Sequence, residues 1–329
     1  MTSQPVYTAH DVADLFNLLP TLLGFVPEES ICAIATSGPR RRFGFRLRID
    51  VPTTDEHVGH AGRFVAGHLR NHGADGAIVL VVSRHVERAG AAARAVERHL
   101  GPVQPVVVAW TDGERYWTSD PADPVGGTVL DLSPHHPAVV SAVLAGQEVL
   151  PDRATLERRW APARGGLAWL PGAVLEVERR VAAESVRLGR AEVGATGARE
   201  VLAVAEPDAS TVRSDDGAVL RAGVWLTHAV VRERLWARHD RGSAERALAG
   251  WRDLARRSPG TYAAVPYAMA GYLAYLVGDG AQASIGLQHA LAADPGYAMA
   301  DQLAQALSSG LHPDALLTLV RRAMALASP

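Results

Sequence analysis

Three short apolar runs indicate strands that are buried on both faces. They are Ile31 to Ala35, Ala77 to Val82 and Val106 to Trp110, and none is interrupted by a charged residue. None has the helical spacing of apolar positions, and each is too continuous to tolerate a wet face. We therefore expect all three to be central strands of one sheet.

Two further strands have polar or alternating patterns. From Phe43 to Val51, large apolar residues alternate with glycine, arginine and aspartate, which is typical of a strand with one dry and one wet face. The turn signal Ser37-Gly38-Pro39 predicts a hairpin with the strand before it, and Asp112-Gly113 predicts a second hairpin that leads into Arg115 to Thr118. We expect these strands at or near the edges of the sheet.

Helical periodicity separates the strands. A helix capped by Thr8 or Asp11 is expected to end at Pro20, and others are expected at 55–71, 86–100 and from Ser133 to about 146. Strands that alternate with helices favour a mixed sheet with helices packed on it. The predicted fold class is α/β (α+β), with an N-terminal mixed-sheet α/β sandwich over residues 1–150.

The second half of the chain is predicted to be all helical. A stretch rich in proline and glycine at 151–172 reads as a linker with a short helix, and an all-helical domain follows at 173–329. Strand signals are missing there. Helices are expected at 173–190, 217–238, 244–257, 264–277, 281–293 and 313–326.

Small residues in this half fall at the spacing of a tetratricopeptide repeat, around residues 264–297. They are Gly271, Gly278, Asp279, Ala283, Ala290, Asp294 and Pro295. The resemblance implies peptide or protein binding by the positions that match the concave face of such a repeat. These positions are Val265, Ala268, Tyr272, Tyr275 and Leu276. The alternative is that so short an array buries these side chains against its neighbours.

The segment Pro20 to Ser30 reads Pro-x-Leu-Leu-Gly-Phe-x-Pro-x-x-Ser, and in this it resembles an actinobacterial family, the domain of unknown function 4192. The resemblance extends through Arg48 to Pro52, Tyr116-Trp117 and Leu276 to Pro295. It implies a family whose biochemical role is unassigned. Many members have a cluster of cysteines after the Trp117 region, but this chain has none there, so a metal or redox role that depends on that cluster does not carry over.

Composition excludes several classes of enzyme. The chain has 329 residues, a formal net charge of -2 and one cysteine, Cys32, so it has no thiolate-rich zinc site and no evident footprint for nucleic acid. All 33 basic residues are arginine. Without lysine there is no Walker-type phosphate loop and no pyridoxal-phosphate Schiff base. No apolar run reaches the roughly 18 residues of a spanning helix, and the N-terminus lacks the pattern of a signal peptide, so we expect a cytoplasmic protein without a cofactor.

A histidine stripe is a weak metal candidate. His57, His60, His68 and His72 lie on one side of the predicted helix 55–71. Leu69, Arg70 and Asn71 separate the last two, so the general-base glutamate of the zinc-protease motif is missing. Histidines at the boundary of an apolar core are the favoured interpretation.

Other polar groups are weighed against structural explanations. Arg46, Arg48 and Asp50 on the wet face of one strand are ligand-binding candidates that could bind an anion or form carboxylate-arginine pairs. Ser133 next to His135 and His136 superficially resembles a nucleophile with its base, but helix capping explains the serine.

No catalytic constellation emerges from these patterns. The leading hypothesis is a non-enzymatic protein-binding or scaffold module. The alternative is a small-ligand sensor or enzyme with its site at the carboxyl ends of the strands, near Thr36, Ser83 and Thr111, where open α/β sheets bind ligands.

Overall fold

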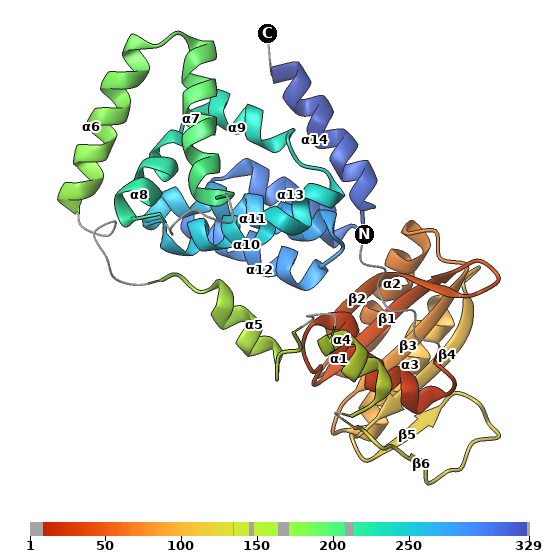
Figure 1. The fold of residues 1–329 in the computed structure, drawn as a ribbon. Coiled ribbons are helices and arrows are strands. Elements are labelled where there is room, and N and C mark those ends of the chain that lie inside the picture. Colours follow the sequence, from red (N-terminus) through yellow and green to blue (C-terminus); the bar gives the residue numbers. More distant parts are fainter. Residues whose placement is uncertain (1–8, 134, 145–147, 164–170, 208–213, 328–329) are drawn as a thin grey trace. The chain divides into compact units, whose positions relative to one another are not determined.

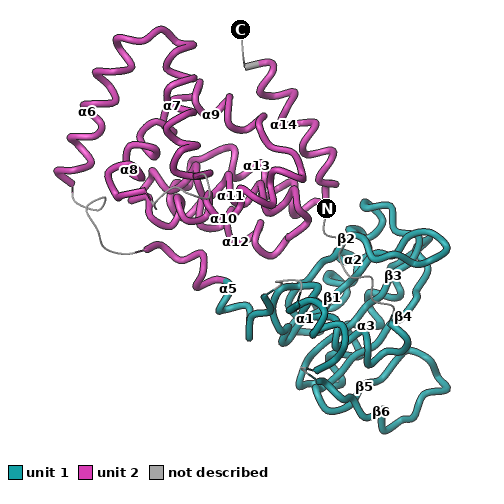
Figure 2. The backbone as a smooth tube through the Cα atoms, in the orientation of Figure 1, with its two compact units in different colours: residues 1–156 teal, residues 157–329 magenta. Residues whose placement is uncertain are grey.

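The computed structural model of the protein describes residues 9–133, 135–144, 148–163, 171–207 and 214–327. The chain divides into two compact units, Met1–Leu156 and Glu157–Pro329 (Figure 2).

The first unit is built on one six-stranded sheet with the strand order β2-β1-β3-β4-β5-β6 (Figure 1). The three apolar runs form the adjacent strands β1, β3 and β4, which confirms their predicted central position. The strands are β1 (Ser30–Ser37), β2 (Arg42–Asp50), β3 (Gly76–Val82), β4 (Gln104–Thr111), β5 (Arg115–Thr118) and β6 (Thr128–Val129).

Strand directions follow from the connections. The two predicted hairpins pair β1 with β2 and β4 with β5, both antiparallel. β1 is also antiparallel to β3, whereas β3 and β4 are parallel and are joined through a helix. The sheet is therefore mixed, as predicted.

Helices cover both faces of the sheet. α2 (Asp55–Asn71) and α3 (Val86–His99) pack over one core, which contains Ile31, Val79 and Trp110. α1 (Val12–Leu23) packs over the second core, which contains Ile34 and Leu80 from the opposite sheet face. Neighbouring residues of β1 and β3 thus enter different cores, which is why those strands are apolar without alternation.

Two local predictions need correction. α1 runs through Pro20 and ends at Leu23, where Gly24 adopts a φ of 77° and donates its N–H to the Pro20 carbonyl oxygen. A proline within a helix removes only its own N–H bond, so the turn that follows can continue. In β2, Phe43 is exposed because it lies beyond an irregularity in the pairing with β1, and only Phe45, Leu47 and Ile49 pack on the α2–α3 core.

The end of the first unit contains two short helices. α4 (Pro137–Leu144) packs against α1, and α5 (Arg153–Trp160) extends into the second unit. The predicted helix start at Pro134 and its end near 146 lie outside the described residues, as do the predicted cap Thr8 and residues 164–170 of the predicted linker.

The described residues 171–207 and 214–327 of the second unit contain helices and no strand. α10, α11 and α12 are consecutive neighbours, and α11 is packed between the other two. The elements are α6 (Pro171–Arg187), α7 (Arg190–Ala205), α8 (Asp216–Trp225), α9 (Ala229–Trp236), α10 (Arg241–Arg257), a 3-10 turn (Gly260–Ala263), α11 (Ala264–Leu276), α12 (Gly280–Ala293), α13 (Ala298–Ser308) and α14 (Pro313–Ala327).

This unit departs from the sequence prediction in three places. The helix expected at 217–238 is two helices, α8 and α9, and the helices α7 and α13 were not predicted. Gly194 and Gly197 lie inside α7, where a Cβ at Gly197 would be 2.5 Å from Val231 Cγ2 of α9. These glycines permit a close helix contact, and the sequence pattern alone does not distinguish that use from a turn.

Candidate functional site

The carboxyl end of β3 is occupied by a carboxylate of the chain itself. The Ser83 hydroxyl donates to Glu29 Oε2 at 2.7 Å, and the Arg84 N–H donates to Glu29 Oε1 at 3.0 Å. Ser83 and Thr111 are each 1 % exposed. Because β1 is antiparallel to β3, Thr36 lies at the opposite end of the sheet, so its expected grouping with Ser83 and Thr111 is wrong.

The polar side chains of β2 contact one another and neighbouring polar groups of the first unit. Arg48 is 8 % exposed, and its Nε donates to the Ser30 hydroxyl at 2.7 Å. Its Nη1 lies 2.6 Å from Asp50 Oδ1, and Asp50 is 81 % exposed. Arg46 Nη1 donates to the carbonyl oxygen of Leu22 at the end of α1. Arg48 and Asp50 thus form a carboxylate-arginine pair, which was one of the two expectations for this strand. Arg46 donates a hydrogen bond to the end of α1.

The histidine stripe divides into two pairs. His57 and His60 are exposed near the start of α2, with His57 Nδ1 2.6 Å from the Thr54 hydroxyl. His68 is buried and donates from Nδ1 to the Phe64 carbonyl oxygen, and the His72 ring stacks on Phe45. Within the described part of the chain, no three His, Cys, Asp or Glu side chains are grouped to hold a metal ion.

The single cysteine is a core residue. Burial raises the pKa of the Cys32 thiol to about 12, although the nearby Arg48 charge acts in the opposite direction. The thiol is therefore protonated at neutral pH and is a poor nucleophile.

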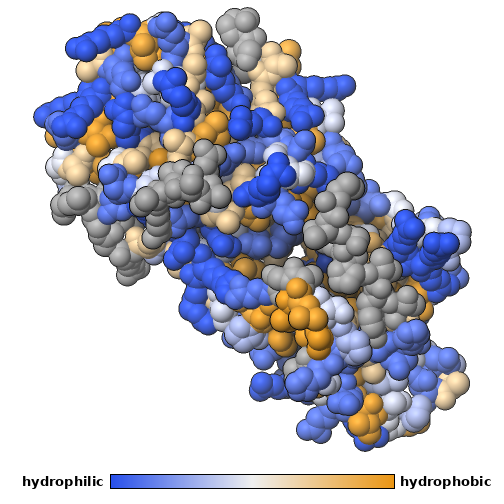
Figure 3. All heavy atoms as spheres, in the orientation of Figure 1, coloured by the Kyte–Doolittle hydropathy of each residue, from blue (hydrophilic) through white to orange (hydrophobic). Residues whose placement is uncertain are grey.

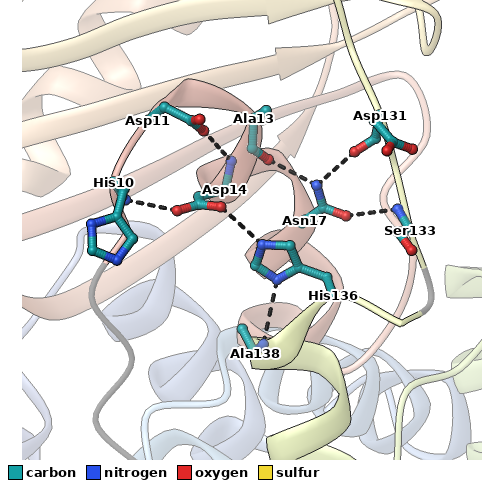
Figure 4. A network of polar contacts seen from close by, with 9 residues as sticks. All are labelled: His10, Asp11, Ala13, Asp14, Asn17, Asp131, Ser133, His136 and Ala138. Atoms are coloured by element: carbon teal, nitrogen blue, oxygen red, sulfur yellow. Dashed lines mark hydrogen bonds and ion pairs between the residues drawn. The ribbon is translucent and has the colours of Figure 1, made fainter.

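A polar network joins α1 to the segment before α4 (Figure 4). His136 Nε2 lies 2.9 Å from Asp14 Oδ1, and the Ala138 N–H points to His136 Nδ1 at 3.4 Å. Since Nδ1 accepts from a backbone donor, Nε2 carries the proton and donates to the carboxylate. The Asn17 amide donates to two backbone carbonyls and accepts from the Ser133 N–H.

This network has the parts of a nucleophile, a base and an acid without their geometry. The Ser133 hydroxyl accepts from the His135 N–H in its own turn, and both nitrogens of His136 are engaged with Asp14 and Ala138. A triad needs the histidine nitrogen at the serine oxygen. The network therefore anchors α4 on α1.

The side chains proposed for a concave binding face lie inside the helical unit. Ala268, Tyr272, Tyr275 and Leu276 are buried, and Val265 is half-buried. The Tyr275 hydroxyl donates to the carbonyl oxygens of Ala306 and Leu311. α11 has α10 and α12 on either side, and this arrangement agrees with the alternative of burial against neighbours for the four buried residues.

One exposed apolar patch lies on the first unit. The outer face of α4 presents Val140, Val143 and Leu144, and Figure 3 shows a compact hydrophobic area over this helix. Apolar patches are common at protein contacts, but this one has no polar feature that would select a partner.

The helices α10, α11 and α12 hold residues 157–163, which are the last turn of α5 and the three residues that follow it. Trp160 is 0 % exposed and lies against α12, where a Cβ on Gly286 would be 2.6 Å from Trp160 Cζ3. The Tyr267 hydroxyl donates to the Trp160 carbonyl oxygen at 2.7 Å, and the Arg252 guanidinium lies 5.9 Å from the indole ring centre. We call this receiving surface, formed by Arg252, Arg256, Tyr267, Gly286 and His289, the Trp160 site.

The next residues are held by their backbone. Arg256 Nε donates to the Ala161 carbonyl oxygen at 2.9 Å, and the Ala163 N–H donates to the Arg256 carbonyl oxygen at 2.7 Å. The His289 ring of α12 stacks on the Tyr267 ring, with 4.9 Å between the ring centroids. Burial lowers the pKa of His289, and the nearby Glu157 carboxylate partly offsets this. The Trp160 site therefore combines a packing position for one aromatic ring with two donors and one acceptor for the backbone at and after the end of α5.

Comparison with known proteins places the chain in a family. A family model described as "Domain of unknown function (DUF4192)" matches residues 13–314. The chain belongs to the DUF4192 family. No curated protein and no solved structure matches it.

The segment that resembled the DUF4192 pattern has a structural use in this member. Phe25 is buried beside Leu150, and the Val26 N–H donates to the Leu150 carbonyl oxygen, which joins the first helix to the end of the unit. Ser30 accepts from Arg48, and Glu29, with a φ of 41°, reaches the end of β3. The pattern thus closes the fold around β1.

The residues of the Trp160 site were not found from sequence. The available signal was a large apolar residue, Trp160, between charged neighbours and Pro162 in a stretch that otherwise reads as a linker. Such a residue needs a cavity elsewhere. Its receivers Arg256, Tyr267 and His289 have no distinguishing spacing.

Proposed function

We propose that this DUF4192 protein is a non-enzymatic binding module that holds other proteins on its helical unit. The observation that supports this is the Trp160 site, where three packed helices hold the last turn of α5 and the backbone after it by two donors, an acceptor and the packing of an aromatic ring. Helical arrays commonly recognise short segments of other proteins on such surfaces.

We further propose that α11 and α12 form a tetratricopeptide-like repeat. Gly271 and Gly286 meet where these helices cross, since a Cβ on Gly286 would lie 2.9 Å from Gly271 Cα. Close contact between small residues is the feature that the sequence pattern suggested. The expectation of a cytoplasmic protein of actinobacterial origin stays a prediction.

The competing hypothesis of an enzyme or sensor at the strand ends has less support. Glu29 occupies the end of β3, and Thr36 lies at the other end of the sheet. None of the described helices is long and apolar enough to cross a membrane.

Crosslinking with mapping of the linked residues tests the module. Because the chain has no lysine, amine-directed reagents would miss it, so a carboxyl-directed reagent should be used on the full chain in extracts of its native cells. We expect a reproducible protein partner linked to carboxylates within 171–327. Absence of a specific partner, together with a small metabolite that co-purifies with the full chain, would overturn the proposal.

A further inference from the structure

The Trp160 site has the properties of a receptor for a peptide. Its receivers come from three helices, and the crossing of α11 and α12 at Gly271 and Gly286 brings two of them together through contacts of the helices themselves. The held segment contributes one large side chain, Trp160, and otherwise backbone atoms. Backbone groups are present in any peptide, so these hydrogen bonds do not depend on sequence.

The fit of the resident segment is incomplete. Trp160 Nε1 is buried, and no hydrogen-bond partner lies within reach among the described residues. Indole N–H groups usually find a partner when buried. The resident segment therefore leaves one donor of its anchor unused.

Chemical features of the site define the segment it fits. The cavity beside Gly286 takes a flat aromatic ring, and Arg252 above it favours an electron-rich ring such as indole. Glu157, three residues before Trp160, lies near His289, which places an acidic side chain on that side. The residues after the tryptophan are small or proline, as required by the close approach of the backbone to Arg256.

We propose that the Trp160 site binds a segment of a partner protein in which a helical turn, with an acidic residue and a tryptophan three positions later, is followed by small residues with proline. Residues 157–163 of this chain are its resident, exchangeable ligand. This inference rests on the proposed function and names the class of segment that the module binds. The resident segment competes with the partner because it occupies the same cavity and the same backbone donors.

Binding of a labelled peptide tests the exchange. The peptide has the sequence of residues 157–163, Glu-Arg-Arg-Trp-Ala-Pro-Ala, and its binding to the full chain is followed by fluorescence anisotropy. The Trp160→Ala variant, whose own anchor is missing, should bind it at least about tenfold more tightly than the wild type, because a tethered ligand competes at high effective concentration. A peptide with alanine in place of the tryptophan should not bind.

Matched variants locate the binding. In the Trp160→Ala background, Arg256→Ala should weaken binding at least about tenfold, since it removes a charged donor. Arg199→Ala, the same change at an exposed position of α7, should leave binding unchanged. Ala163→Pro is a second way to release the resident segment, because it removes the N–H that donates to Arg256 and leaves the receiving helices intact. It should also bind the peptide more tightly than the wild type.

The outcomes separate this proposal from the module itself. If Trp160→Ala and Ala163→Pro both bind no more peptide than the wild type, or if Arg256→Ala and Arg199→Ala act alike, the assignment of the site is overturned. Should Trp160→Ala not fold, the comparison of Ala163→Pro with wild type decides. If the peptide-binding tests fail but a partner is mapped to residues 171–327, the proposed binding module stands and only its assigned ligand is refuted. If the peptide-binding tests and the partner mapping both fail, the binding module is refuted as well.

Discussion

Gly250 in α10 is the position where a single added carbon should do most damage to the helical unit. An ideal Cβ there would lie 1.9 Å from the carbonyl oxygen of Ala205, the last residue of α7. Carbon-oxygen contacts begin at about 3.3 Å, so Gly250→Ala requires a separation of about 1.4 Å between the helices. That end of α7 is held in place, since the neighbouring Glu206 accepts from Trp251 Nε1 at 3.0 Å.

The expected change in the free energy of unfolding on Gly250→Ala is the difference between two opposed effects. Overpacking of this severity costs about 3 kcal/mol, and alanine in place of glycine regains about 1 kcal/mol of helix propensity. We expect Gly250→Ala to lower the free energy of unfolding of the second unit by about 2 kcal/mol. Gly242→Ala in the same helix is the control, because its nearest neighbour, Asp240 Oδ1, is at 3.7 Å, and it should leave stability unchanged or raise it slightly.

Hydrogen exchange measured at increasing urea concentration checks this, since it reports each unit separately. Protection in α7, α10 and α11 should fall in Gly250→Ala, while β1, β3 and β4 keep theirs. If Gly250→Ala and Gly242→Ala have the same protection in the helical unit, the close crossing of α7 and α10 is refuted.

Two further predictions concern the core and the pH dependence. Leu80→Ala, at a fully buried position of β3, should lower the free energy of unfolding in urea by about 2–5 kcal/mol because of the cavity left behind. Leu319→Ala, at an exposed position of α14, should change it by about 0.5 kcal/mol or less. Equal effects would contradict the two-core arrangement. For Glu206, burial opposes ionisation, but the His239 imidazole 3.2 Å away, the hydrogen bond from Trp251 and the Arg238 charge outweigh it and hold the carboxyl pKa below the ordinary 4.5. A depressed carboxyl pKa stabilises the fold above about pH 4.5, and that contribution is lost as pH falls through the folded-state value. Melting temperatures measured from pH 7 to 3 should therefore fall less in Glu206→Gln than in the wild type, and parallel curves would show that the ionised carboxylate adds no stability.

The parts of the fold that the sequence predicted share one property. β1, β3 and β4 are buried on both faces by two helical layers, so their apolar runs depend on local composition alone. The position of β2 at the edge of the sheet was predicted because its apolar and polar residues alternate. What the sequence did not predict depends on distant partners: α7 contains glycines that matter only because Val231 of α9 packs on them.

The surroundings of the candidate site residues depend on parts of the chain that are distant in the sequence. Arg46 and Arg48 suggested an anion site, because sequence shows which charges share a strand face but not which carbonyl groups face them. Tyr272 and Tyr275 had the right spacing for a binding face, yet α11 has neighbours on both sides and buries them. Burial of a helix face is decided by the number of helices around it, which a single repeat pattern leaves undetermined.

The exclusive use of arginine connects the structural contacts with the proposed binding site. A guanidinium is a fork of fixed donors that can bind a carbonyl oxygen and still pack its stem, which an ammonium group does less well. In both units arginine side chains donate to backbone oxygens that close a segment onto its neighbour: Arg46 to Leu22, Arg48 to Glu28, Arg115 to Gly126 and Gly127, Arg256 to Ala161, and Arg257 to Ser214. Arg256 uses this interaction on Ala161, directly after α5 and its buried anchor Trp160. Since the interaction recognises a carbonyl group, which every peptide has, the same arginine that holds residues 157–163 is chemically suited to hold the backbone of a partner, and the tryptophan cavity supplies the selectivity that the arginine lacks.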